Sequence, residues 1–238
     1  MWRLAFMLAV WAGHAAAGCR DVAFEGASYT VCDVSAADDL QLFHSGPEGA
    51  LGSFSAVDQA LEPQGLRLDF AMNAGMYHRD LAPVGLYVED GVQATPLVTR
   101  AGPGNFGLVP NGVFCIADRL RVIETLAFAA EKPACRFATQ SGPMLVIAGK
   151  LHPKFLTDSD SLNIRNGVGV SVDGSRAVFA VSNDQVNFYT FARLFRDGLG
   201  MPDALYFDGS ISRLYDHDSG RHDAGFPMGP MVGVVVRR

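Results

Sequence analysis

The sequence predicts a single α+β domain built on a mixed, largely antiparallel sheet system with a few packed helices. Short alternating or apolar runs separated by turn dipeptides recur along the chain, and only two segments show helical periodicity. No linker, low-complexity tract or internal repeat divides the chain. With 238 residues, 49% of them hydrophobic and 18% charged, it has the composition of a packed globular protein.

The first segment of the chain, residues 1–17, reads as a signal peptide. One arginine precedes an apolar stretch too short to span a bilayer, and Ala15–Ala17 match the small-residue pattern of a cleavage site. We therefore expect a periplasmic or secreted domain over residues 18–238, with no membrane span after cleavage. The alternative is a lipoprotein lipidated at Cys19, although such signals usually carry Leu where this chain has Ala16.

Four cysteines form an even set in a chain that we expect to be exported, where disulfides form and persist. We favour the pairs Cys19 with Cys32 and Cys115 with Cys135, because each closes a local loop. The first pair would join the ends of a hairpin whose turn is Glu25–Ala27. No two cysteines have the tight spacing of zinc ligands, so no cysteine metal site is expected.

Strands are predicted where apolar or alternating runs flank turn dipeptides. Asp90-Gly91 and Asp173-Gly174 predict hairpins, because both central positions of such a turn can adopt positive φ, and Ala148-Gly149 predicts a weaker one. The segments concerned are GLYVEDGVQATPLV, VFCIADRLRVIET, MLVIAGKLHP and VGVSVDGSRAVFAVS. Tight hairpins pair neighbouring strands, so an antiparallel sheet system follows.

Two helices are predicted. The segment SFSAVDQALEPQG offers Ser53 or Ser55 as N-cap and then breaks at a proline and a glycine. The segment VNFYTFARLFRDGLG ends at Gly198 and places four apolar side chains on one face, namely Phe188, Phe191, Ala192 and Phe195. It leads into the apolar run Ala204–Phe207, which we expect to be a strand buried on both faces and ending at Asp208.

Polar residues stand at the ends of four apolar runs, each beside a glycine. They are Asn73, Tyr77, His78, Asn111, Arg165 and Asp208. A strand end beside glycine can present a side chain into a cleft and leave room for a ligand. It is also where ordinary turns occur, and Asn73 and Asn111 are good turn formers.

Arg165 enters a predicted core strand, where an unpaired guanidinium would be costly to bury. Anion binding and a buried ion pair, with Asp208 as one possible partner, both explain it. His217 and His222 lie in the polar loop DHDSGRHD, whose spacing fits no standard metal site, so no metal is expected.

Several functional classes are disfavoured. No G-x-S-x-G elbow, P-loop or dinucleotide fingerprint occurs, and no cofactor is expected. The net charge of −6 and the lack of a Lys and Arg run argue against nucleic-acid binding. A small molecule or glycan is the expected ligand.

Six stretches in order resemble the phosphodiester glycosidase family, in particular an exported bacterial branch: MNAGMY, PNGVF, QSGPMLV, IRNGVGVS, LYFDGSISRLY and GPMVGVVV. The family includes the mammalian uncovering enzyme, an N-acetylglucosamine-1-phosphodiester alpha-N-acetylglucosaminidase, and the resemblance runs roughly from Cys19 to the end. It implies a hydrolase that releases free sugar from a sugar-1-phosphodiester. The fullest family form has Asp-Gly-Gly-Gly-Ser, whereas Ser210 and Ile211 replace two glycines here. Their side chains narrow the space beside Asp208, which bears on the sugar and leaving group more than on the reaction class.

This reaction requires a cation that holds the phosphate and a carboxylate that stabilises the anomeric carbon or activates water. Arg165, with its bidentate fork, and Asp208 are the catalytic candidates. The substrate-binding candidates are Asn73, Tyr77, His78, Asn111, Gly209, Ser210 and Ser212. Among them we expect the asparagines to position sugar hydroxyls or phosphate oxygens, Tyr77 to form a stacking wall and Ser212 to add a donor.

Two other functions stay open. A glycoside hydrolase acting on envelope polysaccharide would need a second carboxylate, for which Asp158 or Asp160 is available. A non-catalytic envelope protein that binds a phosphorylated glycan could use the same Arg and Asn residues. A carboxylate at the centre of an anion site weakens binding, so Asp208 favours the enzyme.

Overall fold

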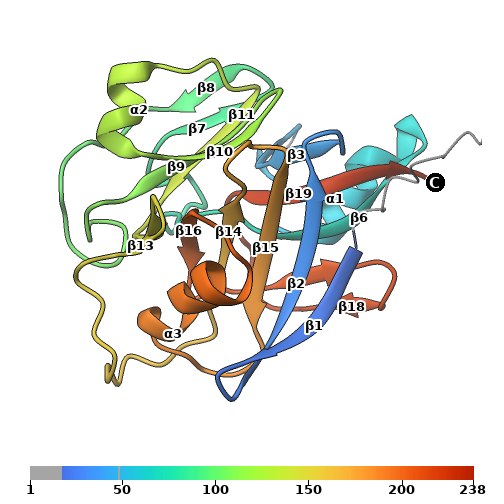
Figure 1. Ribbon diagram of the computed structural model, residues 1–238. Coiled ribbons are helices and arrows are strands. Elements are labelled where there is room, and N and C mark those ends of the chain that lie inside the picture. The colour runs from blue at the N-terminus through green and yellow to red at the C-terminus, as the bar shows by residue number, and fades with distance from the viewer. Residues whose placement is uncertain (1–17, 48) are drawn as a thin grey trace, which may run out of the picture.

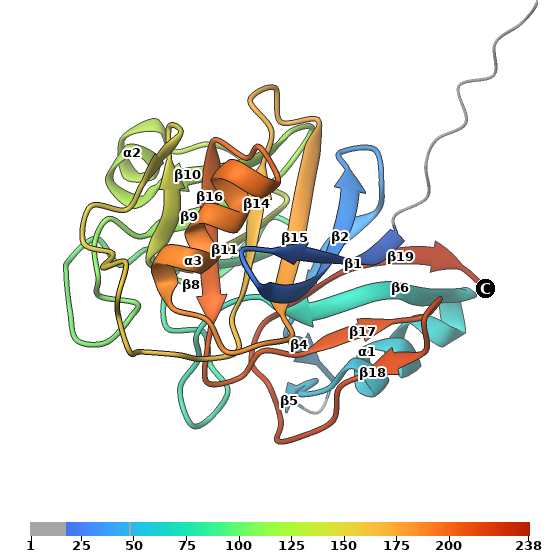
Figure 2. The ribbon, with the colours of Figure 1, turned by 60° about the horizontal axis from the view of Figure 1, so that its bottom comes forward.

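Three antiparallel sheets enclose a shared apolar core, and a short helix packs on the outer face of each (Figure 1, Figure 2). The structure, a computed structural model, describes residues 18–47 and 49–238. The α+β class and the single domain are confirmed. All strand pairs formed by these residues are antiparallel, without the parallel pairs that a mixed sheet would add. The predicted signal peptide lies outside the described residues.

The largest sheet contains seven strands in the order β1-β2-β15-β14-β16-β12-β13. Its strands are β1 (Gly18–Phe24), β2 (Ala27–Ser35), β12 (Met144–Ile147), β13 (Lys150–Leu151), β14 (Asn166–Val170), β15 (Arg176–Ser182) and β16 (Asp203–Asp208). One face turns to the shared core, and the other packs on α3 (Phe188–Arg193) and the turn Leu194–Gly198 that continues it.

The predicted two-sided burial of the strand before Asp208 is confirmed in β16. Leu205 and Phe207 lie in the shared core, whereas Ala204 and Tyr206 lie in the cluster beneath α3. The alternation follows from the pleat of the strand, which sends successive side chains to opposite faces. Asp208 is therefore carried by a strand that packing holds from both sides.

The two five-stranded sheets have the orders β18-β17-β6-β19-β3 and β10-β9-β11-β7-β8. The first comprises β3 (Leu40–Phe43), β6 (Leu66–Asn73), β17 (Leu214–Asp216), β18 (Arg221–His222) and β19 (Met231–Arg237), with α1 (Phe54–Leu61) and the 3₁₀ turn Glu62–Gln64 on its outer face. The second comprises β7 (Tyr87–Glu89), β8 (Val92–Thr95), β9 (Gly112–Ile116), β10 (Leu120–Glu124) and β11 (Phe137–Ser141), with α2 (Thr125–Glu131) outside. A small hairpin, β4 (Ser45–Gly46) and β5 (Gly49–Ala50), completes the fold.

Both predicted helices are confirmed, and a third was missed. Ser53 caps α1 by accepting a hydrogen bond from Ala56 N at 3.2 Å, which settles the choice between two serines. The missed helix is α2, which follows β10 without a break and is capped by Glu124. Because no turn residue separates the two elements, the sequence pattern of the strand masked the start of the helix.

The predicted hairpin turns are also confirmed. Asp90 and Gly91 have φ of 47° and 78°, and Ala148 and Gly149 have φ of 47° and 77°. Both pairs connect adjacent strands, β7 with β8 and β12 with β13. Asp173-Gly174 lies in a longer turn between β14 and β15, so this hairpin is confirmed, but only Gly174, with φ of 69°, adopts the positive φ predicted for both residues.

Both predicted disulfides are present. Cys19 and Cys32 face each other across β1 and β2, and Cys115 of β9 is joined to Cys135 before β11. Two disulfides indicate an oxidising compartment of the kind that exported proteins occupy. No helix within residues 18–47 and 49–238 is long and apolar enough to cross a bilayer.

Candidate active site

Three strands from two sheets end at one corner of the shared core. β6 ends at Asn73, β14 begins at Asn166 and β16 ends at Asp208. Asn166 pairs with Asp208 within the seven-stranded sheet, whereas β6 belongs to the sheet of β19. The structure thus brings together two candidates, Asn73 and Asp208, and adds Asn166, which the sequence analysis did not single out.

The two buried asparagines join the sheets at this corner. Asn73 Nδ2 donates to Asn166 Oδ1 at 3.3 Å, and Asn166 Nδ2 donates to the main-chain oxygen of Asn73 at 2.8 Å. Both side chains are fully buried. Buried amides need partners for their polar atoms, and here each asparagine supplies them to the other.

The same amides also hold residues 208–213, which we term the Asp208 loop. Asp208 N donates to Asn166 Oδ1 at 3.1 Å, and Arg213 N donates to Asn73 Oδ1 at 3.0 Å. The start and the end of the loop are therefore tied to buried groups of two different sheets. Asn73 has a clear scaffolding role here, and its predicted contact with substrate stays a prediction.

The carboxylate of Asp208 is oriented by the main chain of its own loop. Its Oδ1 accepts hydrogen bonds from Gly209 N at 2.6 Å and Ser210 N at 2.8 Å. Burial raises the pKa of Asp208, and the N–H groups of Ser210, Gly209 and Ile211 partly oppose that rise. No cation of the described residues forms an ion pair with it. The site therefore holds a carboxylate whose charge is not neutralised by direct contact with a cation.

Gly209 lets the Asp208 loop approach two large side chains of the core. A Cβ at Gly209 would lie 2.1 Å from the Tyr206 hydroxyl and 3.6 Å from Arg165 Nη1. The first distance is far below any normal carbon contact, so a side chain here would displace Tyr206. The contact gives a steric reason for glycine at this position, and its predicted role toward substrate stays a prediction.

Arg165 lies directly below this loop and is 0% exposed. Its Nε donates to Val186 O at 2.8 Å, its Nη2 to Ser161 O at 2.8 Å and its Nη1 to Tyr206 Oη at 3.3 Å. The buried ion pair with Asp208 that the sequence left open is not formed. Main-chain carbonyls and a phenol solvate the guanidinium instead.

Aromatic rings complete the surroundings of Arg165. The guanidinium carbon lies 3.7 Å from the centroid of the Phe188 ring and 5.5 Å from that of Tyr206, which are cation–π distances. Burial lowers the pKa of Arg165, and Tyr206 opposes this. A guanidinium stays protonated in proteins, so the core carries a full positive charge beneath the Asp208 loop. Three of its five N–H groups are used, which leaves one on each terminal nitrogen.

Tyr77 lies near Asp208 on the loop that follows β6. Burial raises the pKa of Tyr77, the negative charge of Asp208 adds to the rise, and the charge of Arg213 opposes it. The Tyr77 hydroxyl donates to Pro227 O at 3.3 Å. His78, the next residue, is exposed at the tip of the same loop, where Leu81 N donates to its carbonyl. The negative charge of Asp208 therefore acts on the Tyr77 hydroxyl, whereas His78 is exposed.

Asn111 supports a different loop. Its Nδ2 donates to Phe106 O at 2.8 Å, and its Oδ1 accepts from Thr125 Oγ1 at 2.7 Å. The structure places Asn111 as a support for that loop, and its expected contact with substrate is untested.

A polar pocket of about 570 Å³, which we term the site pocket, opens beside the Asp208 loop. Its lining includes Gly209, Ser210, Ile211, Ser212, Gln185 and Asp223. Ser210 is exposed, whereas the Ser212 hydroxyl donates to Asp208 O at 2.9 Å and stabilises the loop. The two residues that replace family glycines, Ser210 and Ile211, thus line this pocket.

Other candidate groups are not part of this corner. Asp158 and Asp160 are exposed on the loop that precedes Arg165. His217 and His222 are exposed near β17 and β18. Within the described parts of the chain, no group of three or more His, Cys, Asp or Glu side chains is arranged to hold a metal ion.

Two residues of the site were missed by the sequence analysis. Tyr206 stands two residues before Asp208 on β16, and the pairing of β16 with β14 shifts register between these two residues. Asn166 directly follows Arg165 at the start of a strand. Both positions could have been recognised as candidates because they lie close in sequence to Asp208 and Arg165. Their hydrogen-bond partners, however, come from distant segments of the chain.

Comparison with known proteins shows the family of this chain. Residues 67–234 match the phosphodiester glycosidase family, and this stretch contains the candidates from Asn73 to Ser212. The uncharacterized protein YigE of Escherichia coli strain K12 is 40% identical over 167 residues, which are 70% of this chain and 65% of that protein. The chain therefore spans slightly less than two thirds of the length of that relative.

Two solved structures share the fold. The catalytic domain of zebrafish N-acetylglucosamine-1-phosphodiester alpha-N-acetylglucosaminidase, auto-inhibited by its pro-peptide, has a TM-score of 0.62 at 13% identity and covers 92% of this chain and 82% of its own. A hypothetical protein from Synechocystis has a TM-score of 0.58 at 15% identity, with 92% and 61% covered. At these identities the likeness concerns the fold alone.

Proposed function

Because this chain belongs to the phosphodiester glycosidase family, we propose that it is an exported hydrolase that cleaves the glycosidic bond of a sugar-1-phosphodiester and releases the free sugar. The observation that carries the proposal is the Asp208 carboxylate. It is half-buried, oriented by two main-chain N–H groups and set on a loop that two sheets hold in place. Such preorganisation is what electrostatic catalysis requires.

The proposed reaction breaks the bond between the anomeric carbon and the phosphate oxygen. The electron pair of that bond leaves with the phosphate, and a water molecule adds to the anomeric carbon and loses a proton. Positive charge develops on the carbon, so the nearby negative Asp208 stabilises it or accepts the proton from water. The departing phosphate is a weak base, so no strong general acid is needed opposite Asp208.

The positive charge of Arg165 supports the binding of the phosphate. No carboxylate of the described residues neutralises this guanidinium. Its surroundings are less polar than water and screen its charge less, so the charge acts over a longer distance. We assign it to attracting the anionic part of the substrate toward the Asp208 loop. We assign Tyr77 to stacking on the sugar ring.

The proposal is tested by measuring release of free sugar from a panel of sugar-1-phosphodiesters. The protein is purified from cells that express the full chain, and the Asp208→Asn variant is run beside it. We expect the substitution to lower kcat at least about a hundredfold, because it removes the negative charge and the base. Asp203→Asn is the matched control, since Asp203 lies at the other end of β16 and accepts a bond from Ala148 N.

Each outcome of this assay decides something. Sugar release by the wild type and by Asp203→Asn but not by Asp208→Asn supports the reaction and its carboxylate. Full activity of Asp208→Asn contradicts the mechanism. Saturable binding of the panel without any release would make the protein a binding protein for phosphorylated glycans.

Export rests on two findings of different kinds. The two disulfides need an oxidising compartment, and residues 1–17 have the sequence of a signal peptide. Mass spectrometry of the purified protein tests the proposal, because cleavage should leave a chain that begins near Gly18. A diacylglycerol adduct on Cys19 would instead identify a lipoprotein.

A further inference from the structure

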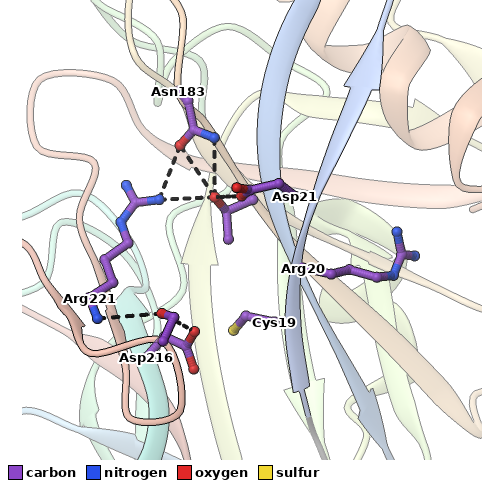
Figure 3. Close-up of a pocket in the computed structure, with 8 residues that line it drawn as sticks. Cys19, Arg20, Asp21, Asn183, Asp216 and Arg221 are labelled. Atoms are coloured by element: carbon purple, nitrogen blue, oxygen red, sulfur yellow. Dashed lines mark hydrogen bonds between the residues drawn. The ribbon is translucent and has the colours of Figure 1, made fainter.

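A polar pocket of about 490 Å³ lies against β1 and β2, outside the residues assigned to the reaction (Figure 3). The two strands line one side of it, and Asn183 and the hairpin of β17 and β18 line the other. None of its lining residues belongs to the site pocket, so the two are separate cavities. Its volume lies in the range of sites for small molecules, about 300–1,000 Å³.

Asp216, the last residue of β17, carries a buried carboxylate into this pocket. The residue is 5% exposed. Its Oδ2 accepts a hydrogen bond from the Ser219 hydroxyl, whereas no described residue donates to its Oδ1 (Figure 3). A carboxylate removed from water is costly unless a cation or several hydrogen bonds compensate its charge. A single hydroxyl leaves most of this charge uncompensated.

The arginine that lies opposite Asp216 in the hairpin is engaged elsewhere. Arg221 is paired with Asp216 in the register of β17 and β18. Its guanidinium instead donates to Asp223 Oδ2 from Nη2 at 2.9 Å, and to Thr30 Oγ1 and Asn183 Oδ1 from Nη1, both at 3.0 Å. Asp223 lines the site pocket rather than this one. Arg221 therefore orders the pocket but forms no ion pair with Asp216.

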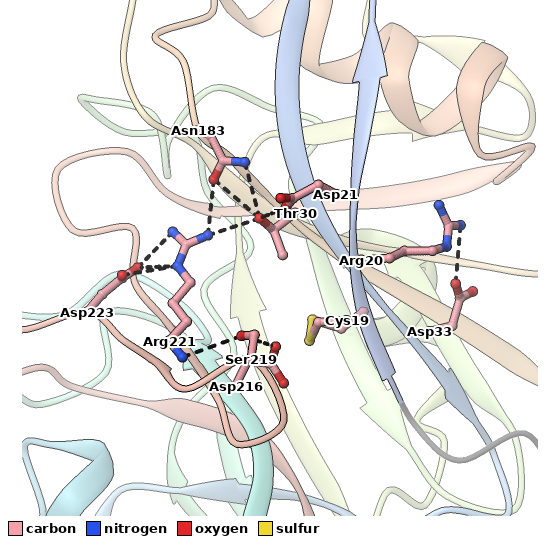
Figure 4. The surroundings of a disulfide bond; sticks show 11 residues. Cys19, Arg20, Asp21, Thr30, Asp33, Asn183, Asp216, Ser219, Arg221 and Asp223 are labelled. Carbon is pink, nitrogen blue, oxygen red and sulfur yellow. Dashed lines mark hydrogen bonds and ion pairs between the residues drawn. A yellow bond between two sulfur atoms is a disulfide. The ribbon is translucent and has the colours of Figure 1, made fainter.

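A second carboxylate, that of the exposed residue Asp21 on β1, also lines the pocket. Its Oδ1 accepts a hydrogen bond from Thr30 Oγ1 at 2.6 Å. The adjacent Arg20 points away and pairs with Asp33 of β2, with Nη2 3.4 Å from Oδ2 (Figure 4). Among the described residues, neither Asp21 nor Asp216 has a cation as ion-pair partner. The pocket thus presents two carboxylates that no direct contact with a cation neutralises.

A small organic cation suits these groups better than a metal ion. A calcium ion takes roughly six to eight oxygen ligands at about 2.3–2.6 Å. In the described parts of the chain, no group of three or more His, Cys, Asp or Glu side chains is arranged to hold a metal. A protonated primary amine needs fewer partners, because it has only three N–H donors. The pocket supplies acceptors for them in Asp216 and Asp21, and its volume leaves room for the organic part.

From these observations we propose that the pocket against β1 and β2 binds a small organic amine, with an ammonium group at Asp216 and its polar remainder directed to Asp21. The inference goes beyond the proposed function and does not rest on it, because no residue assigned to the reaction lines this pocket. The loop that contains Asp216, DHDSGRHD, fits no metal site by its spacing, and an amine gives its buried carboxylate a different partner.

Titration calorimetry at neutral pH tests the proposal, on protein purified from cells that express the full chain. The probes are diaminobutane, the uncharged butanediol of the same length and calcium chloride. We expect saturable binding of the diamine and at least about tenfold weaker binding of the diol, because hydrogen bonds between charged groups are stronger than neutral ones. Since the readout is binding, the result stands whether or not the protein hydrolyses a phosphodiester.

Asp216→Asn should weaken binding of the diamine at least about tenfold, because it removes the buried charge. Asp218→Asn is the matched control, since Asp218 is exposed in the same turn, does not line the pocket and changes the net charge by the same amount. A general attraction of amines to a chain of net charge −6 would weaken equally in both variants. The proposal requires a loss in Asp216→Asn alone.

Asp21→Asn is the second variant in case Asp216→Asn fails to fold, since Asp21 is exposed. It should weaken binding of the diamine by about twofold to fivefold, the range of an exposed ion pair. The proposal is overturned if the diamine does not bind, if the diol binds equally well or if calcium alone binds. It is also overturned if neither Asp216→Asn nor Asp21→Asn lowers the affinity, which would leave Asp216 with a structural role in its turn alone.

Discussion

Asp208 is subject to two opposing influences on its pKa. Removal from water raises the pKa, whereas three main-chain N–H groups favour the charged form and lower it. The rise prevails, and no cation in contact with the carboxylate reverses it. A carboxylate in this state has a stronger affinity for a proton than an exposed one, which suits a group that must accept a proton or stabilise a neighbouring cation.

The raised pKa of Asp208 predicts where kcat/KM falls on the acidic side of its pH profile. We expect kcat/KM to fall on acidification with an apparent pKa above 3.8, the ordinary value for aspartic acid, because the ionised form is the active one. No second limb from a protonated acid is expected, since the leaving phosphate needs none. The measurement is kcat/KM on a sugar-1-phosphodiester over a range of about pH 3 to 9. A limb at or below 3.8, or a bell-shaped profile of two carboxyl groups, would contradict this assignment.

The same shift has a consequence for stability that needs no substrate. Because the pKa is raised in the folded state, the folded protein binds the proton more tightly than the unfolded chain, and its stability gains as pH falls through the raised pKa. Asp208→Asn lacks this gain. Asp208→Asn should therefore have a higher Tm than the wild type near neutral pH, and the difference between the two Tm values should shrink in acid.

At the scale of the element, the Asp208 loop depends on sterics as much as on hydrogen bonds. Buried asparagines hold its ends, and Gly209 brings its main chain against Tyr206. The side chain of Tyr206 in turn contacts Arg165 through its hydroxyl. The loop, the strand beneath it and the buried cation thus form one packed unit.

A double-mutant cycle tests that unit. Gly209→Ala should destabilise the protein by about 1–3 kcal/mol, because its Cβ overlaps the Tyr206 hydroxyl. Tyr206→Phe in the same chain removes the overlapping oxygen and should recover part of the loss. Urea unfolding of the wild type, both single variants and the double variant gives the coupling energy. Gly102→Ala is the control, since a Cβ there meets no atom within 4 Å. If the effects of Gly209→Ala and Tyr206→Phe on the free energy of unfolding simply add, the packing argument is wrong.

At the scale of the whole molecule, the three sheets stabilise one another through the shared core. Phe70, Phe114 and Phe179 come from three different sheets, and the Phe179 ring packs against the other two, tilted to Phe70 at a centroid distance of 5.4 Å and edge-on to Phe114 at 5.7 Å. The corner that carries the site is formed where two of these sheets meet. The site therefore depends on the assembly of the whole core, to which Cys32 of one disulfide belongs.

The Cys115–Cys135 disulfide should contribute measurably to this assembly. It closes a loop with a sequence separation of 20 that contains α2. In the chain-entropy model, a disulfide that closes a loop of this length in the unfolded chain raises the free energy of unfolding by about 3 kcal/mol. Replacing both cysteines by serine should lower Tm accordingly and leave the Cys19–Cys32 pair intact. Thermal unfolding with and without reductant checks this, and an unchanged Tm in the variant would argue against it.

Several features of the protein follow from the sequence alone because they are local. Turn dipeptides identify hairpins, the period of apolar residues identifies α1 and α3, and cysteines that close local loops identify the disulfides. The order of six short motifs indicated the family that residues 67–234 match. The strand that carries Asp208, with both faces buried, was also readable from its apolar run.

Other features were decided only by the tertiary structure, because they depend on contacts between distant segments. Asn73 and Asn166 are 93 positions apart, and nothing near either residue specifies the other as its partner. Arg165 was recognised as costly to bury, but its solvation by carbonyls and rings, rather than by Asp208, depends on where the loops before and after it fold. The pocket against β1 and β2 likewise joins side chains from distant parts of the chain, Thr30 with Arg221, which are 191 positions apart. Local pattern determines which residues are buried, whereas the packing of the sheets determines what each buried polar group meets.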